Sequence, residues 1–368
     1  MTITFLLPRY PTISGGFKAV YQFANHLTRR NHEVIVVHPR RLDDPPAPNQ
    51  LAGLARTVRR FAKIFIQPSL HWQPLDKRVK LVYTADLAPR HIPEGDAVVA
   101  TFWKTAEHVI RYPVSKGRKF YLVMDFDPWA GPRDRLEATW RSPLKKLTIS
   151  RWLYEKVVNA GASPDETINI ALGINHQIFR LIDGISARPK RVVMLYSLMG
   201  YKVPEDGLHA LEIAKARHPD LEGTIFGPLP RRPRVLPSWL TYEGNVPETS
   251  LVEIYNGARV YVCCSLAEGF AFPPAEAMAC GCAVTSTDCG GVREYAEPEV
   301  NALLSPPHNP EALAANIVRL LEDDNLRQRL ARAGHERIQE YTWDRSTDLL
   351  EAFVTKYVGQ DTVYSQGE

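Results

Sequence analysis

Short apolar runs, most of them rich in β-branched residues, recur along the whole chain and predict buried β-strands. Segments with helical spacing of apolar residues separate many of them, and this βα alternation is typical of a parallel sheet. The runs form two series, and together they predict two doubly wound α/β lobes. The predicted strands are Ile3–Leu7, Glu33–His38, Val79–Tyr83, Ala97–Thr101, Phe120–Met124 and Leu147–Ser150 in the first series, and Val192–Leu195, Thr224–Phe226, Val260–Cys264 and Ala283–Ser286 in the second.

The segment between the two series has the composition of an exposed linker. Residues 182–189, IDGISARP, combine Gly, Ser, Pro and charged side chains. We therefore divide the chain into an N-terminal domain, residues 1–184, and a C-terminal domain, residues 185–342. Residues 343–368 contain a further helical pattern that suits packing on either domain, including a return to the N-terminal one.

Composition and charge narrow the class of protein. Hydrophobic residues make up 45% of the 368 residues and charged residues 23%, as in an ordinary globular protein. The net charge of +4 hides an asymmetry, because residues 1–180 carry 27 basic and 15 acidic groups and the remainder carries 18 and 26. One lobe is therefore expected to face an anionic surface or substrate. The basic residues are scattered, so no nucleic-acid partner is expected.

The sequence lacks the features of a signal peptide and of a membrane-spanning stretch, so we expect the protein to be cytoplasmic. The N-terminus, MTITFLLP, lacks the basic region and the apolar length of a signal peptide, and no stretch approaches 18 apolar residues. All five cysteines lie within 27 residues, from Cys263 to Cys289, without the paired C-x2-C spacing of a zinc site. Reduced thiols packed in one core are the expected arrangement.

A glycine pair follows the first predicted strand. Gly15 and Gly16 directly precede an amphipathic helix that has Val20, Phe23 and Leu27 on one face. Backbone amides at such a helix start suit a phosphate, although a tight turn explains the pair equally well. The G-x-G-x-x-G fingerprint and the P-loop are both absent, which argues against a nicotinamide dehydrogenase and a P-loop NTPase.

The most specific motif is EGFAFPPAEAMACG, in which Glu268 and Glu276 bracket seven residues. Pro273 and Pro274 favour a helix start and place Glu276 in the first helical turn. The helix N-terminus attracts phosphate, whereas two carboxylates repel it. Each acid is therefore expected to accept hydrogen bonds from sugar hydroxyls, and a sugar nucleotide supplies both kinds of group.

These motifs resemble the retaining glycosyltransferases of family 4, which have the GT-B fold of two Rossmann-like lobes facing across a cleft. The resemblance covers nearly the whole chain and includes the stretches ALGINHQIFR, DCGGVREYA and RIQEYTWDRST. It implies that Glu276 binds the nucleotide ribose and that Glu268 holds the transferred sugar. The donor-binding residues expected from the motifs and the resemblance are Gly15, Gly16, Lys202, Gly269, Phe270, Ala271 and Glu276.

One residue of the family pattern is missing. The family usually places an arginine and a lysine at the start of the second lobe to hold the diphosphate, and the segment LYSLMGYKVPEDG contains only Lys202. A leaving diphosphate gains negative charge, so Lys202 and Glu268 are candidate catalytic residues and a second cation is expected elsewhere. Arg9, Arg231 and Arg232 are candidates among which the sequence does not choose.

Asp125 is the third candidate catalytic residue. It follows a predicted strand in a stretch, FYLVMDFDPWAG, that is similar to bacterial rhamnosyltransferases of surface-glycan assembly. A position at the cleft would let it accept a hydrogen bond from donor or acceptor, and a loop cap is the alternative. Asp125 and Asp127 also spell D-x-D, but a two-lobed chain needs no metal to bind diphosphate. We expect no metal site and no required cofactor.

The resemblance implies retaining transfer of a sugar, for example rhamnose from dTDP-rhamnose, to a growing surface polysaccharide or a glycolipid. It also implies attack from the front face, without a covalent nucleophile, in which the leaving phosphate takes the acceptor proton. A GT-B nucleotide-sugar epimerase and a noncatalytic nucleotide-sugar-binding subunit are the alternatives. Turnover of any donor would exclude the binding subunit.

Residues 51–66 have apolar side chains at helical spacing and four basic residues with no acid between them. Two interpretations stay open. The helix lies on the anionic inner face of the membrane and brings the cleft near a lipid-linked acceptor, or it is a solvated helix whose apolar face packs on the N-terminal lobe. The first would make the protein a peripheral membrane enzyme.

Overall fold

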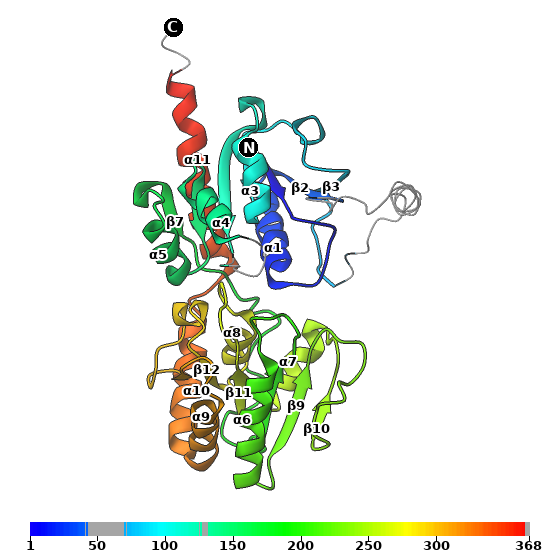
Figure 1. The fold of residues 1–368 in the computed structure, drawn as a ribbon, viewed down its shortest axis with the longest axis vertical. Helices are drawn as coiled ribbons and strands as arrows, with labels where there is room; N and C mark the ends of the chain where they lie inside the picture. Colours follow the sequence, from blue (N-terminus) through cyan, green and yellow to red (C-terminus); the bar gives the residue numbers. More distant parts are fainter. Residues whose placement is uncertain (41, 43–69, 71, 125, 127–131, 365–368) are drawn as a thin grey trace.

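The computed structural model describes residues 1–40, 42, 70, 72–124, 126 and 132–360, and the backbone of 361–364. Two lobes lie one above the other along the long axis of the molecule (Figure 1). Each lobe contains one parallel sheet. The predicted pair of doubly wound α/β lobes is therefore confirmed.

The N-terminal sheet has seven strands in the order β3-β2-β1-β4-β5-β6-β7. Its central strands are apolar on both faces and buried, as a sheet covered on both sides by helices requires. The strands are β1 (Thr2–Leu6), β2 (Glu33–Pro39), β3 (Lys80–Thr84), β4 (Ala97–Ala100), β5 (Arg118–Val123), β6 (Lys145–Thr148) and β7 (Thr167–Asn169). The helices are α1 (Gly15–Arg29), α3 (Trp103–Ile110), α4 (Arg133–Arg141) and α5 (Arg151–Asn159).

The C-terminal sheet repeats this plan with six strands in the order β10-β9-β8-β11-β12-β13. In both lobes the strand order reverses beside the first strand, and in open α/β sheets ligands bind at that point, outside the carboxyl ends of the strands. The strands are β8 (Arg191–Leu195), β9 (Glu222–Phe226), β10 (Leu240–Tyr242), β11 (Val260–Cys263), β12 (Ala283–Thr287) and β13 (Leu303–Ser305). The helices are α6 (Pro204–Arg217), α7 (Glu248–Asn256), α8 (Phe272–Ala279), α9 (Pro310–Glu322) and α10 (Asp324–Ile338).

The chain passes between the lobes twice. The first passage is the connection before β8, where Arg188 turns inward and donates hydrogen bonds to the carbonyl oxygens of Ala258 (3.0 Å) and Cys280 (2.7 Å). The second passage leads from α10 into α11 (Trp343–Tyr364), which returns to the N-terminal lobe and packs against α1 (Figure 1). Glu351 of α11 accepts a hydrogen bond at 2.7 Å from Arg30, the residue directly after α1.

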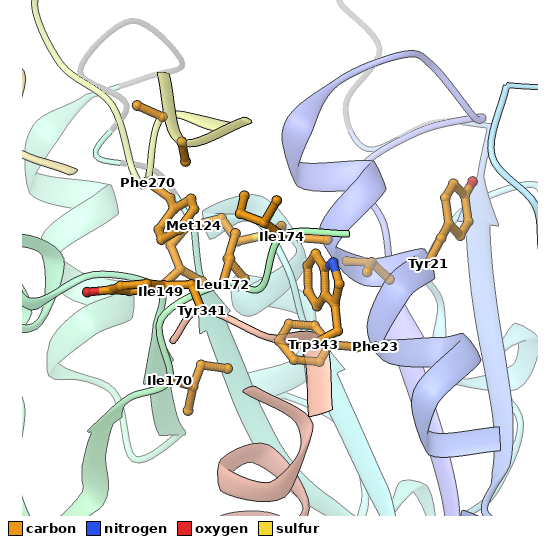
Figure 2. Packing of buried hydrophobic residues seen from close by; sticks show 14 of the residues in the cluster. Tyr21, Phe23, Met124, Ile149, Ile170, Leu172, Ile174, Phe270, Tyr341 and Trp343 are labelled. Atoms are coloured by element: carbon orange, nitrogen blue, oxygen red, sulfur yellow. The ribbon is translucent and has the colours of Figure 1, made fainter. Parts of the chain in front are cut away.

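One hydrophobic core cluster extends through both lobes and joins them. Figure 2 shows Phe270 of the C-terminal lobe above Met124, with Tyr341 beside them and Trp343 against Phe23 of α1. The Trp343 and Phe23 rings are arranged edge to face with centroids 5.4 Å apart. Because these contacts are apolar and buried, the lobes are packed together in this conformation.

The five cysteines are free thiols, and all are buried. Four of them belong to the cluster that joins the lobes, whereas Cys264 belongs to a second cluster within the C-terminal lobe, so the thiols do not share one core as expected. In the described part of the chain, no helix has the length and apolar content needed to cross a membrane. Residues 51–66, for which a membrane-surface helix was one interpretation, lie outside the described residues.

Candidate donor-binding site

The segment that carries the paired glutamates is held at the end of β11 by backbone hydrogen bonds. The Glu268 amide donates to the carbonyl oxygen of Cys289 at 2.8 Å, and the Gly291 amide donates to that of Glu268 at 3.0 Å. Three residues later, Ala271 adopts a left-handed conformation with φ +65° and caps α8. A non-glycine residue there costs about 1–3 kcal/mol, and such strain concentrates at functional sites.

Glu276 lies deeper in α8 than the sequence predicts. The helix begins at Phe272, one residue before Pro273, so Glu276 is the fifth helical residue and belongs to the second turn. The expectation of a first-turn position was wrong, because the helix starts directly after the left-handed Ala271. The Glu276 side chain remains at the inter-lobe face, where it is 6% exposed.

Glu268 forms a buried ion pair with Lys202, the lysine that precedes α6. Burial opposes the charged form of Lys202, but the carboxylate of Glu268 outweighs this effect and raises the lysine pKa. The next residue, Val203, has a left-handed conformation with φ +32° and caps α6. A small cavity adjoins this pair, lined in part by Ser265 and Pro273. Lys202 and Glu268 thus meet at the carboxyl ends of β8 and β11, as a donor site requires.

Glu276 is paired with a lysine of the other lobe. Lys18 of α1 places its Nζ 2.6 Å from Glu276 Oε1 and 2.5 Å from Glu248 Oε1, at the start of α7. Burial opposes the charged form of Lys18, but the two carboxylates outweigh it and raise the lysine pKa. Burial also raises the pKa of Glu276, an effect that Lys18 only partly offsets. One ammonium group therefore serves two carboxylates.

Two of the three predicted glycines, Gly15 and Gly269, lie where the two lobes touch. A Cβ added at Gly15 would lie 3.2 Å from the Phe272 ring, and one at Gly16 would lie 3.4 Å from the Met124 side chain. Gly269 approaches most closely, since its Cβ would lie 1.7 Å from the carbonyl oxygen of Met124. Only Gly269 thus leaves no room for a side chain without a shift of the other lobe, whereas Gly15 would require a small shift of the Phe272 ring and Gly16 would make an ordinary contact.

The structure brings most of the predicted donor-binding residues to one inter-lobe face, but the side chain of Phe270 is not accessible there. Phe270 is 2% exposed and packs against Tyr295 and Tyr341, so its side chain belongs to the core. The Ala271 carbonyl oxygen accepts a hydrogen bond from Tyr295 Oη at 2.6 Å. The contribution of Phe270 to a donor is therefore limited to its backbone.

Two predicted carboxylates, Asp125 and Asp127, lie outside the described residues. The last described residue before them, Met124, follows β5 and touches the second lobe through Gly269. Among the residues the structure describes, no three His, Cys, Asp or Glu side chains are grouped so that they could hold a metal ion.

The arginines proposed as a second cation are placed differently from Lys18. Arg232 donates to three backbone carbonyl oxygens that follow it closely in the chain, those of Leu236, Pro237 and Leu240. Arg9 and Arg231 are exposed. Sequence reasoning missed Lys18 and Glu248. The available signal was the position of Lys18, two residues after the glycine pair, at the start of a helix whose amides suit a phosphate.

Comparisons with known proteins find similar sequences. Residues 178–337 match the family model described as glycosyl transferases group 1. The chain is 34% identical over 110 residues to the O-antigen chain mannosyltransferase B of Escherichia coli, an alignment that covers 30% of this chain and 28% of the relative. It is 28% identical over 250 residues to the D-inositol 3-phosphate glycosyltransferase of Acidothermus cellulolyticus, covering 60% and 55%. The chain thus spans about a quarter to a little over half of these relatives.

Solved structures share the fold over the whole chain. The sucrose-phosphate synthase of Thermosynechococcus elongatus superposes with a TM-score of 0.69 at 17% identity, over 98% of this chain and 99% of that one. The Anabaena protein HepE, solved with UDP and glucose, gives a TM-score of 0.72 at 15% identity, over 97% and 100%. The two lobes together therefore have the GT-B fold, and the match to the group 1 glycosyl transferase model is confined to residues 178–337.

Proposed function

We propose that this protein is a retaining glycosyltransferase that takes a sugar from a nucleotide diphosphate sugar and transfers it to a glycan or lipid-linked acceptor. The observation that carries the proposal is the pairing of Glu268 and Glu276 with Lys202 and Lys18 at the start of α8. A nucleotide sugar needs both hydroxyl acceptors and phosphate-binding cations, and these four side chains supply them. The match of residues 178–337 to group 1 glycosyltransferases supports the same activity.

In the proposed reaction, Glu276 accepts hydrogen bonds from the ribose and Glu268 accepts them from the transferred sugar. The bond between the anomeric carbon and the β-phosphate oxygen breaks while the acceptor oxygen bonds to the same face of that carbon. The acceptor proton passes to the departing phosphate, so no carboxylate acts as nucleophile or base. Lys202 stabilises the negative charge that develops on the diphosphate.

The identity of the donor and acceptor is a finer part of the proposal. Rhamnose from dTDP-rhamnose is the expectation from the sequence, and the name of the Escherichia coli relative adds mannose as a second candidate. That relative is named for an O-antigen chain, which supports a surface polysaccharide as the acceptor. We further propose a cytoplasmic enzyme, peripheral at the inner membrane face, that works without a metal.

Incubation with UDP-, GDP-, ADP- and dTDP-linked sugars, with chromatography of the products, tests the activity. Release of nucleoside diphosphate from one donor is the expected result. Glu276→Gln should weaken binding of that nucleoside diphosphate, whereas Glu268→Gln should mainly slow turnover. Conversion of a donor to its epimer without release would instead identify an epimerase. Tight binding without turnover, tested with lipid-linked acceptors present, would identify a binding subunit.

A further inference from the structure

Among the described residues, Lys18 is the one side chain of the N-terminal lobe that contacts both Glu248, at the start of α7, and Glu276, in the second turn of α8. Its Nζ lies within 2.6 Å of Glu276 and Glu248, and its side chain is only 12% exposed. The ammonium group also lies 5.1 Å from the ring centroids of Phe179 and Phe272. An ammonium buried this far must be well compensated, and here two carboxylates and two aromatic faces surround it.

The two glutamates of the motif are thus matched by two lysines. Lys202 neutralises Glu268 from within the C-terminal lobe, and Lys18 neutralises Glu276 from the other lobe. Glu248 remains as an additional carboxylate beside Lys18, and it is 28% exposed. Without the lysines, three neighbouring carboxylates would repel a diphosphate.

A nucleotide diphosphate sugar offers the complementary groups for both kinds of side chain. Its hydroxyls donate to carboxylates, and its phosphate oxygens accept from ammonium groups. Binding of a ribose to Glu276 therefore competes with Lys18 for the same carboxylate. The lysine lies in the first turn of α1, beside Gly15 and Gly16 and the amides of the helix start, which also favour a phosphate.

We propose that Lys18 is a donor-binding cation. When a nucleotide sugar binds, its diphosphate replaces Glu276 as the partner of Lys18. The ion pairs Lys18–Glu276 and Lys202–Glu268 are then both replaced by contacts with the donor. This inference rests on the proposed function and adds a residue of the N-terminal lobe to the donor site. Glu248 keeps a carboxylate beside Lys18 and holds the side chain near the site during the exchange. The second cation that the sequence lacks in the C-terminal lobe then comes from α1.

Calorimetry with UDP, GDP, ADP and dTDP, each beside its nucleoside, tests the proposal. For the diphosphate that the wild type binds, Lys18→Met should lower affinity about 10- to 100-fold, the effect of one hydrogen bond to a charged group. Affinity for the matching nucleoside should not fall, because a nucleoside has no phosphate to contact. Lys18→Arg should retain most of the diphosphate affinity.

Lys80→Met is the matched control, since Lys80 also forms an ion pair, with Glu33, but at the exposed edge of the N-terminal sheet. If Lys18→Met folds poorly, the cause is the repulsion between the carboxylates of Glu248 and Glu276 that Lys18 no longer neutralises. The double variant Lys18→Met, Glu248→Gln removes this repulsion and should show the same loss of diphosphate affinity. Equal or tighter binding of the diphosphate by Lys18→Met or by the double variant, or an equal loss of affinity for the nucleoside, would overturn the role of Lys18. If the wild type binds none of the four diphosphates, the proposed function itself fails, and this inference with it.

Discussion

Replacing Gly269 with alanine perturbs the contact between the lobes at a single atom. The added Cβ would lie 1.7 Å from the Met124 carbonyl oxygen. A carbon and an oxygen that are not bonded lie more than 3 Å apart, so the two segments must separate by more than 1 Å. Backbone forms one side of this contact, and rotation of a side chain does not relieve it.

The size of the effect follows from that displacement. Gly269 directly follows Glu268, so a shift of this segment moves the carboxylate away from Lys202 and from the sugar it is proposed to hold. A misplacement of about 1 Å costs roughly 10²-fold in rate, which corresponds to about 2.7 kcal/mol in the activation free energy. Overpacking also lowers the free energy of unfolding by about 1–3 kcal/mol.

Steady-state donor turnover, with thermal unfolding in parallel, measures both effects for Gly269→Ala. The control is Gly184→Ala, because a Cβ at Gly184 would have no atom within 4 Å. We expect the control to keep wild-type turnover while Gly269→Ala loses about 10²-fold in kcat/KM. If Gly269→Ala were as active as the wild type, the packed arrangement of the lobes could not be the one in which the reaction occurs.

Three further predictions concern the site, the N-terminal lobe and the linker. Lys202→Ala should lower kcat about 10²- to 10³-fold in a donor-turnover assay. EDTA should leave the wild-type rate unchanged in the same assay. Loss of activity in EDTA with rescue by Mn²⁺ would contradict the metal-free proposal. Burial lowers the pKa of His38 to about 4, so the unfolded protein binds a proton more readily below pH 6.5, and its free energy of unfolding should fall by about 2 kcal/mol between pH 7 and 5. Urea titrations of wild type and His38→Asn should show that this share of the pH dependence disappears in the variant. Arg188→Met should cost about 3 kcal/mol in urea unfolding, because it leaves buried carbonyl groups without donors; a loss below 1 kcal/mol would show that water replaces them.

The strand pattern of the sequence located the two sheets and the edge strand β3, but missed the other three edge strands. The ten predicted runs correspond to β1–β6, β8, β9, β11 and β12, and all of these strands except β3 contain buried apolar positions. The missed strands are β7, β10 and β13, each three residues long and each at the edge of a sheet. Edge strands pair on one side only and need few apolar residues, so periodicity carries little signal for them.

The candidate site was also predictable only in part, where its residues lie close together in the sequence. The motif around Glu268 and Glu276 is local in sequence, and its spacing was sufficient to predict two carboxylates beside a helix start. The contacts of Glu276 with Lys18 and Glu248 join segments that are far apart in the chain, so they depend on how the lobes meet. The arrangement of the two lobes cannot be predicted from one sequence alone.

The return of α11 to the N-terminal lobe has a consequence for the order in which the protein is made. Phe120 in β5 is covered by Phe353 and Tyr357 of α11, with ring centroids 6.2 and 6.5 Å away. A ribosome releases these two residues only after the entire C-terminal lobe has emerged. The N-terminal lobe, although synthesised first, therefore keeps an uncovered apolar face and finishes folding last, and nascent chains that pause before α11 are the stage at which chaperones are most needed.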